Sequence, residues 1–246
     1  MLSKLFVKFI GLFGYKLFNK DLVKNQRLID TNSTLNMSFV LDLIFKKNNI
    51  NCVIQIGTND GVRFDELKKY IKSENIKSIL VEPIKKYFEI LKKTYFENKN
   101  IIYENCAIGD KTGDLDIYTV KDEYLKIYDD HIKGISSFNK NHLIKHKVKS
   151  NHIITEKVNV LTINDLMEKH NFLKVDLIYI DAEGYDGNIV INFLENCSCY
   201  PIIIFEYIHI NSDIFKIVTD KLTINKYKYF RVNENLVCFK DGKYIL

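Results

Sequence analysis

Short apolar runs alternate with longer amphipathic stretches along most of the chain. The runs are rich in Ile, Val and Leu, as in strands that are buried on both faces. They predict strands at Cys52–Ile56, Ser78–Val81, Ile101–Cys106, Val175–Gly184 and Pro201–Ile210. Apolar residues at helical spacing predict helices at Leu35–Lys47, Val62–Ser73, Ile84–Glu97, 163–170, 185–194 and Asp213–Leu222, with Thr162 as an N-cap. This alternation predicts an α/β protein with a mostly parallel sheet that helices cover on both faces.

Two parts of the chain depart from this alternation. The stretch "YKYFRVNENLVCFK" predicts two strands around an Asn-Glu-Asn turn, and therefore an antiparallel hairpin at the end of the sheet. The stretch "GDLDIYTV" predicts one short alternating strand, but Asp122–Ile154 is polar, irregular and rich in His and Lys. An irregular stretch of that length is usually a functional insertion, such as a substrate lid, or else mobile.

The N-terminal residues are apolar and basic, and we interpret 1–34 as a helical extension of a domain that spans 35–246. The uncharged piece Phe9–Tyr15 is too short to cross a bilayer, and no small-residue cleavage site follows it. Leu2, Leu5, Phe6 and Phe9 share one face of a helix. That face predicts packing on the domain or self-association through a second subunit. The alternative is peripheral membrane contact by an interfacial basic helix.

The charge distribution and the cysteine content indicate which partners and which cellular location to expect. The 36 basic and 31 acidic residues are interleaved, and the net charge is +5. No long basic block appears, so we do not expect a nucleic-acid partner. Five cysteines without a C-x-x-C pair predict buried reduced thiols. We therefore expect a cytoplasmic protein, in contact with the inner face of the membrane if the N-terminal helix binds there.

The first predicted strand ends in the turn "IGTNDG", which carries the first chemical signal. Gly57 allows a sharp bend, and Gly61 allows a close approach of the backbone to a ligand at the start of the next predicted helix. In an open parallel sheet, ligands bind beyond the carboxyl ends of such strands. The next strand ends in Glu82, 21 residues after Gly61, and a carboxylate there can accept both hydroxyl hydrogens of a ribose. A plain structural turn is the alternative, which the pairing with Glu82 and Pro83 disfavours.

The composition of this turn disfavours NAD as the ligand. The third glycine of the dinucleotide motif is missing, and Thr58, Asn59 and Asp60 fill the loop. Asp60 would repel a pyrophosphate, whereas it suits the ammonium group of an amino acid. The residues therefore favour a ligand that combines a ribose with an amino acid.

Several segments, in this order, resemble the FkbM family of S-adenosylmethionine-dependent methyltransferases. "IQIGTNDG" resembles the family's first cofactor motif, and "VEP" at Val81–Pro83 its ribose-binding motif. "NCAIGDKTGDLDIY" at Asn105–Tyr118 resembles the segment after the third strand, and Ser136 and Ser137 stand where the family tends to have serine. "VNVLTINDLMEKHNFLKVDLIYIDAEGYDG" at Val158–Gly187 resembles the family's helix and acidic strand end. The resemblance covers roughly Asn51 to Glu206.

The resemblance implies a class I methyltransferase fold, a Rossmann-like doubly wound sheet with a terminal antiparallel hairpin, and S-adenosylmethionine as cofactor. It assigns cofactor binding to Gln55, Gly57, Asn59, Asp60, Gly61, Glu82, Pro83, Ala107 and Asp181. The chain departs from the family pattern at three positions. Gln55 replaces an acid, Tyr179 stands where lysine is frequent, and Asp186 replaces a glutamate. We therefore expect the ammonium contacts to fall on Asp60 or on backbone carbonyls.

The strand end "YIDAEGYD" predicts the catalytic residues, which are Asp181, Glu183 and His209. We expect Asp181 to orient donor and acceptor, and Glu183 or His209 to take the proton from an acceptor hydroxyl. Favourable placement of acids at a helix N-terminus is an alternative reason for Glu183 and Asp186. Clustered acids also suit Mg²⁺, but a metal is not favoured. The histidines of the irregular segment are expected to be exposed, and their spacing to fit no compact metal motif.

The sequence therefore predicts an O-methyltransferase of the FkbM type. By family analogy we expect its substrate to be a small molecule or glycan with a free hydroxyl, such as a sugar of a bacterial surface glycan or its nucleotide-activated precursor. One alternative is an oxidoreductase that uses NAD or a nucleotide sugar. The other is a non-catalytic binding module associated with a membrane.

Overall fold

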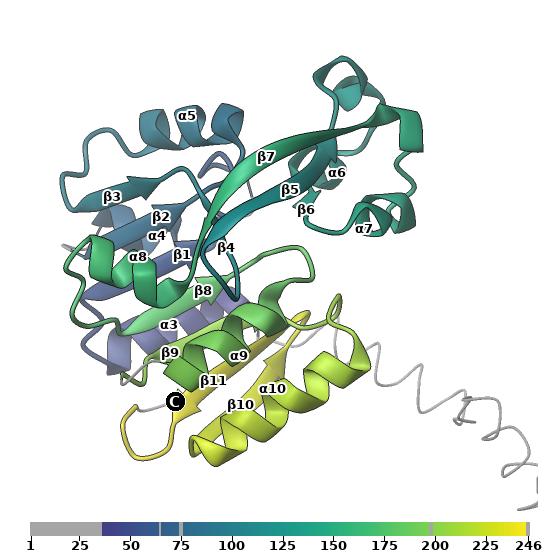
Figure 1. Ribbon diagram of the computed structural model, residues 1–246. Coiled ribbons are helices and arrows are strands. Elements are labelled where there is room, and N and C mark those ends of the chain that lie inside the picture. The colour runs from purple at the N-terminus through teal and green to yellow at the C-terminus, as the bar shows by residue number, and fades with distance from the viewer. Residues whose placement is uncertain (1–35, 64, 74–75, 197–198, 245–246) are drawn as a thin grey trace, which may run out of the picture.

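The apolar runs of the sequence form a seven-stranded central sheet in the computed structural model, which describes residues 36–63, 65–73, 76–196 and 199–244. The predicted N-terminal helix therefore lies outside the described residues. The strands are β1 (Cys52–Ile56), β2 (Lys77–Val81), β3 (Ile101–Glu104), β8 (Leu177–Ile180), β9 (Ile202–Glu206), β10 (Tyr227–Val232) and β11 (Asn235–Lys240). Their order is β3-β2-β1-β8-β9-β11-β10; β11 pairs antiparallel with both β9 and β10, and the other neighbouring strands pair parallel (Figure 1). The predicted parallel sheet and its terminal hairpin are both confirmed.

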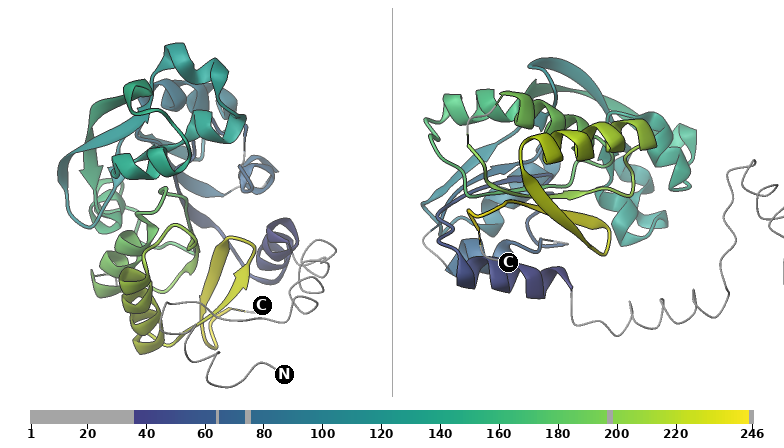
Figure 2. Two further views of the ribbon diagram at one scale, coloured as in Figure 1. Left: turned by 90° about the vertical axis from the view of Figure 1, so that its right-hand side faces the viewer. Right: turned by 90° about the horizontal axis from the view of Figure 1, so that it is seen from below.

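Helices cover both faces of this sheet, so the strands are apolar on both sides. One face packs on α3 (Met37–Lys47), α4 (Lys68–Ser73) and α5 (Lys85–Thr94). The other face packs on α8 (Ile163–Lys169), α9 (Asp186–Asn196) and α10 (Ser212–Ile224). The view from below in Figure 2 shows α3 on one side of the sheet and the green and yellow-green helices on the other. Thr162 caps α8 as predicted, since its hydroxyl accepts the N–H of Asp165 at 3.1 Å.

The prediction of a helix from Val62 to Ser73 is wrong over its first half. Of the described residues in this stretch, Lys68–Ser73 is helical, and those before it form bends and turns. The carboxylate of Asp60 accepts the N–H groups of Val62 and Arg63 at 2.9 and 3.0 Å. Such local bonding to the backbone competes with helix formation and holds the chain in a turn.

A second sheet of four strands was not predicted. Its strands are β4 (Ala107–Ile108), β5 (Gly113–Val120), β6 (Ser136–Ser137) and β7 (Ile153–Leu161), in the order β4-β7-β5-β6. β5 and β7 pair antiparallel from Gly113↔Val160 to Val120↔Ile153, and Figure 1 shows them as a long ribbon that rises from the central sheet. β5 is the alternating strand that the sequence predicted, but its partner lies far away in the chain.

The ribbon carries residues 122–152, which we call the inserted segment. It contains two 3₁₀ helices (Asp122–Ile127 and Ser150–His152), α6 (Asp130–Gly134), β6 and α7 (Lys140–Lys145). Its apolar side chains pack together with Val120 and Ile153 into a small core of their own. The expectation of an irregular segment is therefore wrong, because the segment is folded. Its histidines were expected to be exposed, but His142 and His152 are buried.

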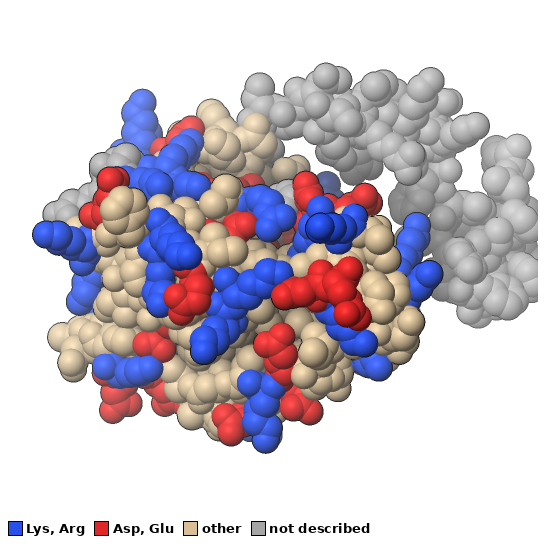
Figure 3. All heavy atoms as spheres, turned by 90° about the horizontal axis from the view of Figure 1, so that it is seen from above, with Lys and Arg blue, Asp and Glu red and all other residues tan. Residues whose placement is uncertain are grey.

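The surface charge, the helix lengths and the cysteines bear on the expectations about nucleic acid, membrane and disulfide bonds. On the face seen in Figure 3, Lys and Arg side chains are interspersed with Asp and Glu. Within the described part of the chain, no helix has the length and apolar character needed to cross a membrane. The cysteines at 52, 106, 199 and 238 are free thiols.

Candidate functional site

A cavity of about 550 Å³ lies at the carboxyl ends of the central strands, where the strand order reverses between β1 and β8. This is the position at which open α/β sheets bind their ligands, and the volume suits a small molecule. Nine of the eleven predicted site residues line it: Gln55, Gly57, Asn59, Glu82, Pro83, Ala107, Asp181, Glu183 and His209. Asp60 and Gly61 are not among the lining residues. The inserted segment supplies the opposite wall, including Gly134, Ser136, Ser137 and His146.

The glycine turn joins the ends of β1, β2 and β8. Gly57 has φ +77°, and a Cβ there would lie 1.9 Å from the backbone oxygen of Asp181. The N–H groups of Gly57 and Thr58 both donate to the carbonyl of Val81, at 3.0 and 3.2 Å. Only glycine permits both this backbone conformation and this approach. The turn therefore holds three strand ends at the bottom of the cavity.

Glu82 ends β2 and is held by the backbone on both of its oxygens. The N–H of Asn59 donates to one carboxylate oxygen at 2.8 Å, and the N–H of Ile84 donates to the other at 2.9 Å. Burial raises the pKa of Glu82 to about 7, although the two N–H groups act in the opposite direction. Each oxygen keeps a further lone pair, so the carboxylate is pre-oriented to accept hydroxyl hydrogens from a ligand in the cavity.

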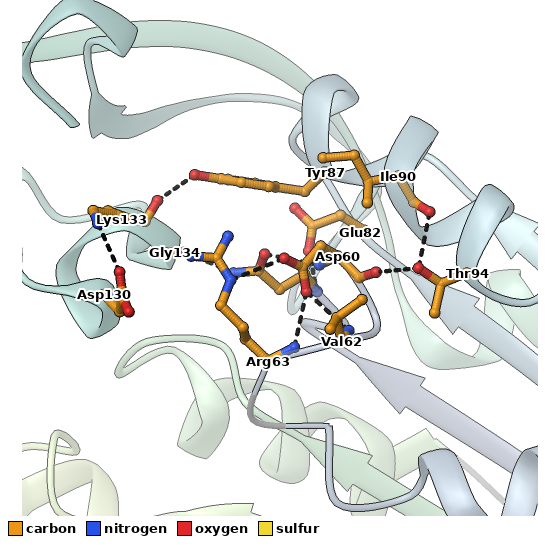
Figure 4. Close-up of polar contacts among 11 residues, drawn as sticks. Asp60, Val62, Arg63, Glu82, Tyr87, Ile90, Thr94, Asp130, Lys133 and Gly134 are labelled. Atoms are coloured by element: carbon orange, nitrogen blue, oxygen red, sulfur yellow. Dashed lines mark hydrogen bonds and ion pairs between the residues drawn. The ribbon is translucent and has the colours of Figure 1, made fainter. Parts of the chain in front are cut away.

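Asp60, which the sequence assigned to an ammonium group, is not among the residues that line the cavity. Its carboxylate accepts two backbone N–H groups and pairs with the Arg63 guanidinium at 3.0 Å (Figure 4). Burial acts to raise its pKa, but the N–H groups of Arg63 and Val62 and the guanidinium outweigh it and lower the pKa. Gly61 likewise serves packing, since a Cβ there would lie 2.8 Å from Leu91 and Tyr95 side-chain atoms on the α5 side.

Gln55 has a buried side-chain oxygen for which the described residues supply no partner. Its amide nitrogen donates to Asp65 at 3.1 Å, whereas Oε1 lies buried without a hydrogen bond. Asp65 and Glu66 also line the cavity, and the Tyr179 hydroxyl donates to Glu66 at 3.0 Å. An unsatisfied buried acceptor is costly, so this oxygen is suited to a ligand N–H. Gln55, which stands where the resembled family has an acid, thus offers one acceptor on this side of the cavity, beside the carboxylates of Asp65 and Glu66.

Asp181, Glu183 and Glu206 form an acidic wall, and the Asp181 side chain is open to the cavity. The surrounding protein, followed by the neighbouring carboxylates, raises the pKa of Asp181 well above its usual range. Burial raises the pKa of Glu206 to about 8. Neighbouring carboxylates that raise one another's pKa favour a cationic ligand, because a positive charge relieves their repulsion.

Asp186 has a structural position at the start of α9. Its buried carboxylate accepts the N–H groups of Ala182 and Gly184, at 3.3 and 3.2 Å, and so closes the turn after β8. Burial raises its pKa to about 7. For Asp186, this position agrees with the alternative explanation from the sequence, in which an acid is favoured at the N-terminus of a helix. Asp181 does not occupy such a position.

The stability of the ligand-free protein is expected to fall as the pH rises from about 5 to about 8. Glu82, Asp186 and Glu206 have raised pKa values of about 7, 7 and 8. The folded protein therefore keeps protons that the unfolded chain has already released, and the resulting stabilisation is lost as the pH passes these values. Thermal denaturation at about pH 5 and about pH 8 measures the change.

Glu206→Gln is the variant that tests this assignment. It should match the wild type near pH 5 and exceed its stability by about 2 kcal/mol near pH 8, since one pKa unit corresponds to about 1.4 kcal/mol and water in the cavity screens part of it. An equal fall with pH in both proteins would contradict the assignment.

His209 follows β9 and lies beside the acidic wall. Its Nε2 is 3.7 Å from Glu206, and burial, followed by the nearby His142, lowers its pKa. The inserted segment contacts both the glycine turn and α5: the Asn59 side chain donates to the Gly134 carbonyl at 3.4 Å, and the Tyr87 hydroxyl of α5 donates to the Lys133 carbonyl (Figure 4).

The lining residues that sequence reasoning missed include Asp65, Glu66 and His146. Asp65 and Glu66 lie in the stretch that was expected to be helical. The spacing of His142 and His146, four residues apart, places both on one face of a helix and was a signal for their pairing.

A seven-stranded sheet in this order, with an antiparallel hairpin at one edge and a glycine turn after its first strand, defines the class I methyltransferase fold. The methyltransferase FkbM domain model matches residues 55–229 of the chain. The protein belongs to this FkbM methyltransferase family.

Solved structures similar to the chain include methyltransferase FkbM from Methylobacillus flagellatus, with 14% identity and a TM-score of 0.47 over 77% of this chain and 43% of that one. A SAM-dependent O-methyltransferase from Thermotoga maritima has 8% identity and a TM-score of 0.41 over 85% and 66%. A precorrin-6y C5,15-methyltransferase from Geobacter metallireducens has 9% identity and a TM-score of 0.41 over 85% and 91%. The chain thus matches less than half the length of the Methylobacillus protein. No curated protein sequence matches the chain.

Proposed function

We propose that this protein is an S-adenosylmethionine-dependent O-methyltransferase. Its acceptor is a hydroxyl of a sugar, in a bacterial surface glycan or in the nucleotide-activated precursor. The observation that carries the proposal is the convergence of Glu82, Gln55 and Asp181 on one cavity at the reversal point of the sheet. Family membership supports methyl transfer, and analogy with the family supports the sugar hydroxyl.

The groups of the cavity fit this cofactor. Glu82 is oriented to accept the two ribose hydroxyl hydrogens. The buried Oε1 of Gln55 needs an N–H donor, which the ammonium group of the amino-acid part provides. The acidic wall of Asp181 and Glu206 favours a cation, and the cofactor carries positive charge on both its ammonium and its sulfonium. None of these groups suits the pyrophosphate of NAD.

When bound, S-adenosylmethionine supplies a methyl group on a positively charged sulfur that leaves as a neutral thioether. The protein has to align the acceptor oxygen with that methyl group and remove the hydroxyl proton. Asp181 is the side chain of the acidic wall that is open to the cavity, and its raised pKa suits a proton acceptor. Glu183 accepts a hydrogen bond from His142 at 2.9 Å, so we assign it to positioning.

The inserted segment forms the wall of the cavity that faces the strand ends, and we propose that it contacts the acceptor. It presents Asp130, Ser136 and Ser137, whose polar groups suit the hydroxyls of a sugar. The segment then acts as the substrate lid expected from the sequence. A cytoplasmic location fits an acceptor that is modified before it is exported.

Glu82→Gln is expected to weaken S-adenosylhomocysteine binding about 30-fold, which corresponds to about 2 kcal/mol for a hydrogen-bonded charge. Isothermal titration calorimetry on the folded variant measures the change. The control is Glu104→Gln, which alters a similarly buried acid at the end of the adjacent strand β3, outside the cavity, where Glu104 pairs with His170 and Lys169. It should bind like the wild type.

Unchanged binding by Glu82→Gln would remove the ribose assignment. Tight binding of NADH in place of S-adenosylhomocysteine would favour the oxidoreductase instead.

A further inference from the structure

Three histidines from two distant parts of the chain meet at the edge of the cavity. His142 lies in α7, His146 caps its C-terminus, and His209 follows β9. The ring centroids are 4.7 Å apart for His142 with His146, 4.7 Å for His142 with His209, and 5.2 Å for His146 with His209. One nitrogen from each ring can be chosen so that all three lie within 4.8 Å of one another. The tertiary structure therefore brings His209 together with two histidines that were expected from the sequence to be exposed.

A carboxylate orients one of the three rings from behind. Nε2 of His142 lies 2.9 Å from Oε2 of Glu183, and the carboxylate can only accept there, so the ring N–H donates. The proton on Nε2 leaves Nδ1 of the same ring with its lone pair. Histidines that bind metals are commonly oriented in this way, with the second ring nitrogen bonded to a carboxylate.

The backbone beside the cluster leaves space for the three rings to approach. Gly184, with φ +93°, lies against His209, and a Cβ there would be 3.4 Å from the His209 Cβ and 3.8 Å from Nδ1 of His142. Glu183 itself has φ +50°, a conformation that most residues avoid. Backbone strain at a turn is typical of sites whose geometry serves a function.

Packing alone explains the cluster poorly. Three rings this close repel one another when protonated. A neutral imidazole is the form that binds a metal ion.

We propose that His142, His146 and His209 together bind one divalent transition-metal ion of the zinc class. Three imidazole nitrogens suit zinc and its neighbours rather than Mg²⁺, which prefers oxygen. Tetrahedral coordination at about 2.0–2.1 Å places the nitrogens about 3.4 Å apart, so the rings draw inward by small rotations when the ion binds. His146 and His209 line the cavity, and the fourth position of the ion is therefore open to it.

The site has a structural consequence that goes beyond the proposed function. Its ligands come from the inserted segment on one side and from the chain after β9 on the other, so a bound ion fastens the inserted segment to the central domain. The oxygen-ligated Mg²⁺ considered from the sequence uses different residues. The proposal does not depend on the identity of the methyl acceptor.

The test uses the full chain without a histidine tag, freed of metal by a chelator and titrated with Co²⁺ and then Zn²⁺. We expect one equivalent of Co²⁺ to give the visible absorption of tetrahedral coordination and Zn²⁺ to displace it. The variants His146→Asn and His209→Asn should lose at least about 100-fold in affinity, and Glu183→Gln about 10- to 100-fold. His170→Asn, which alters a histidine paired with Glu104 outside the site, is the matched control and should bind normally.

Thermal denaturation with and without Zn²⁺ gives a second readout that does not need activity. Zn²⁺ should raise the melting temperature of the wild type and of His170→Asn, but not that of His146→Asn or His209→Asn. The absence of Co²⁺ absorption, or an equal affinity in all four variants, would overturn the proposal. S-adenosylhomocysteine titration of the metal-free protein tests the proposed function separately from the proposed metal site. The metal-free protein should still bind S-adenosylhomocysteine, although its metal site is empty.

Discussion

Asp181→Asn is expected to lower the rate of methyl transfer about 1,000-fold, while S-adenosylhomocysteine binding weakens by at most about tenfold. The amide cannot accept the proton of the attacking hydroxyl, and positioned acid–base groups contribute about 10² to 10⁴ in rate. The Asp181 side chain is open to the cavity, so the substitution removes charge without leaving a hole in the core. Transfer of a labelled methyl group from S-adenosylmethionine to sugar nucleotides and glycan fractions measures the rate.

The pH dependence of the rate gives a further check on this role. The pKa of Asp181 is raised, so the fraction of the active carboxylate form increases with pH. The wild-type rate should therefore rise with pH, at pH values well above those at which a carboxyl group ordinarily ionises. Glu234→Gln is the control, because Glu234 also lines the cavity but lies in the turn between β10 and β11. It should keep most of the rate. A rate for Asp181→Asn within about tenfold of the wild type would exclude Asp181 as the proton acceptor.

Gly57→Ala is expected to destabilise the protein by about 3 kcal/mol and to lower its melting temperature by about 10 °C. Two effects add. The φ of +77° costs about 1–2 kcal/mol in any residue with a Cβ, and the new Cβ would lie 1.9 Å from the Asp181 carbonyl oxygen, so the strand ends must separate.

Gly242→Ala separates these two effects. Gly242 has a similar φ of +74°, but no atom of the described residues lies within 4 Å of the position of its Cβ. This control should therefore show only the backbone cost, about 1 kcal/mol, and normal cofactor binding. Thermal denaturation and S-adenosylhomocysteine titration of both variants measure the difference. Equal losses in the two variants would contradict the close contact between Gly57 and β8.

The parts of the fold that the sequence predicts are those set by local patterns. The runs that became β1, β2, β8 and β9 are apolar on both faces, and turn residues mark their ends. Glu82 was assigned to the cavity because its distance from the glycine turn is fixed by one helix and one strand. Such signals depend on neighbours in the chain, and they identified nine of the lining residues before the structure was known.

The features that sequence reasoning missed depend on contacts between distant residues. β5 and β7 pair across more than 30 residues, which no local period reports. The carboxylate of Asp60 closes its own turn and pairs with Arg63, and the sequence alone does not distinguish such a carboxylate from a free one. His209 meets α7 only through tertiary folding, so its neighbours were not foreseeable from the run "IIIFEYIHI".

The small core of the inserted segment has an evolutionary consequence. Leu143, Val148 and their apolar neighbours stabilise this unit on the β5–β7 ribbon, apart from the helices that cover the central sheet. Substitutions on its inner surface can accumulate while the strand ends around the cavity stay intact. Under the proposed function, in which this unit contacts the acceptor, relatives that share the methyl donor are free to diverge in the molecules they modify by changing this one unit.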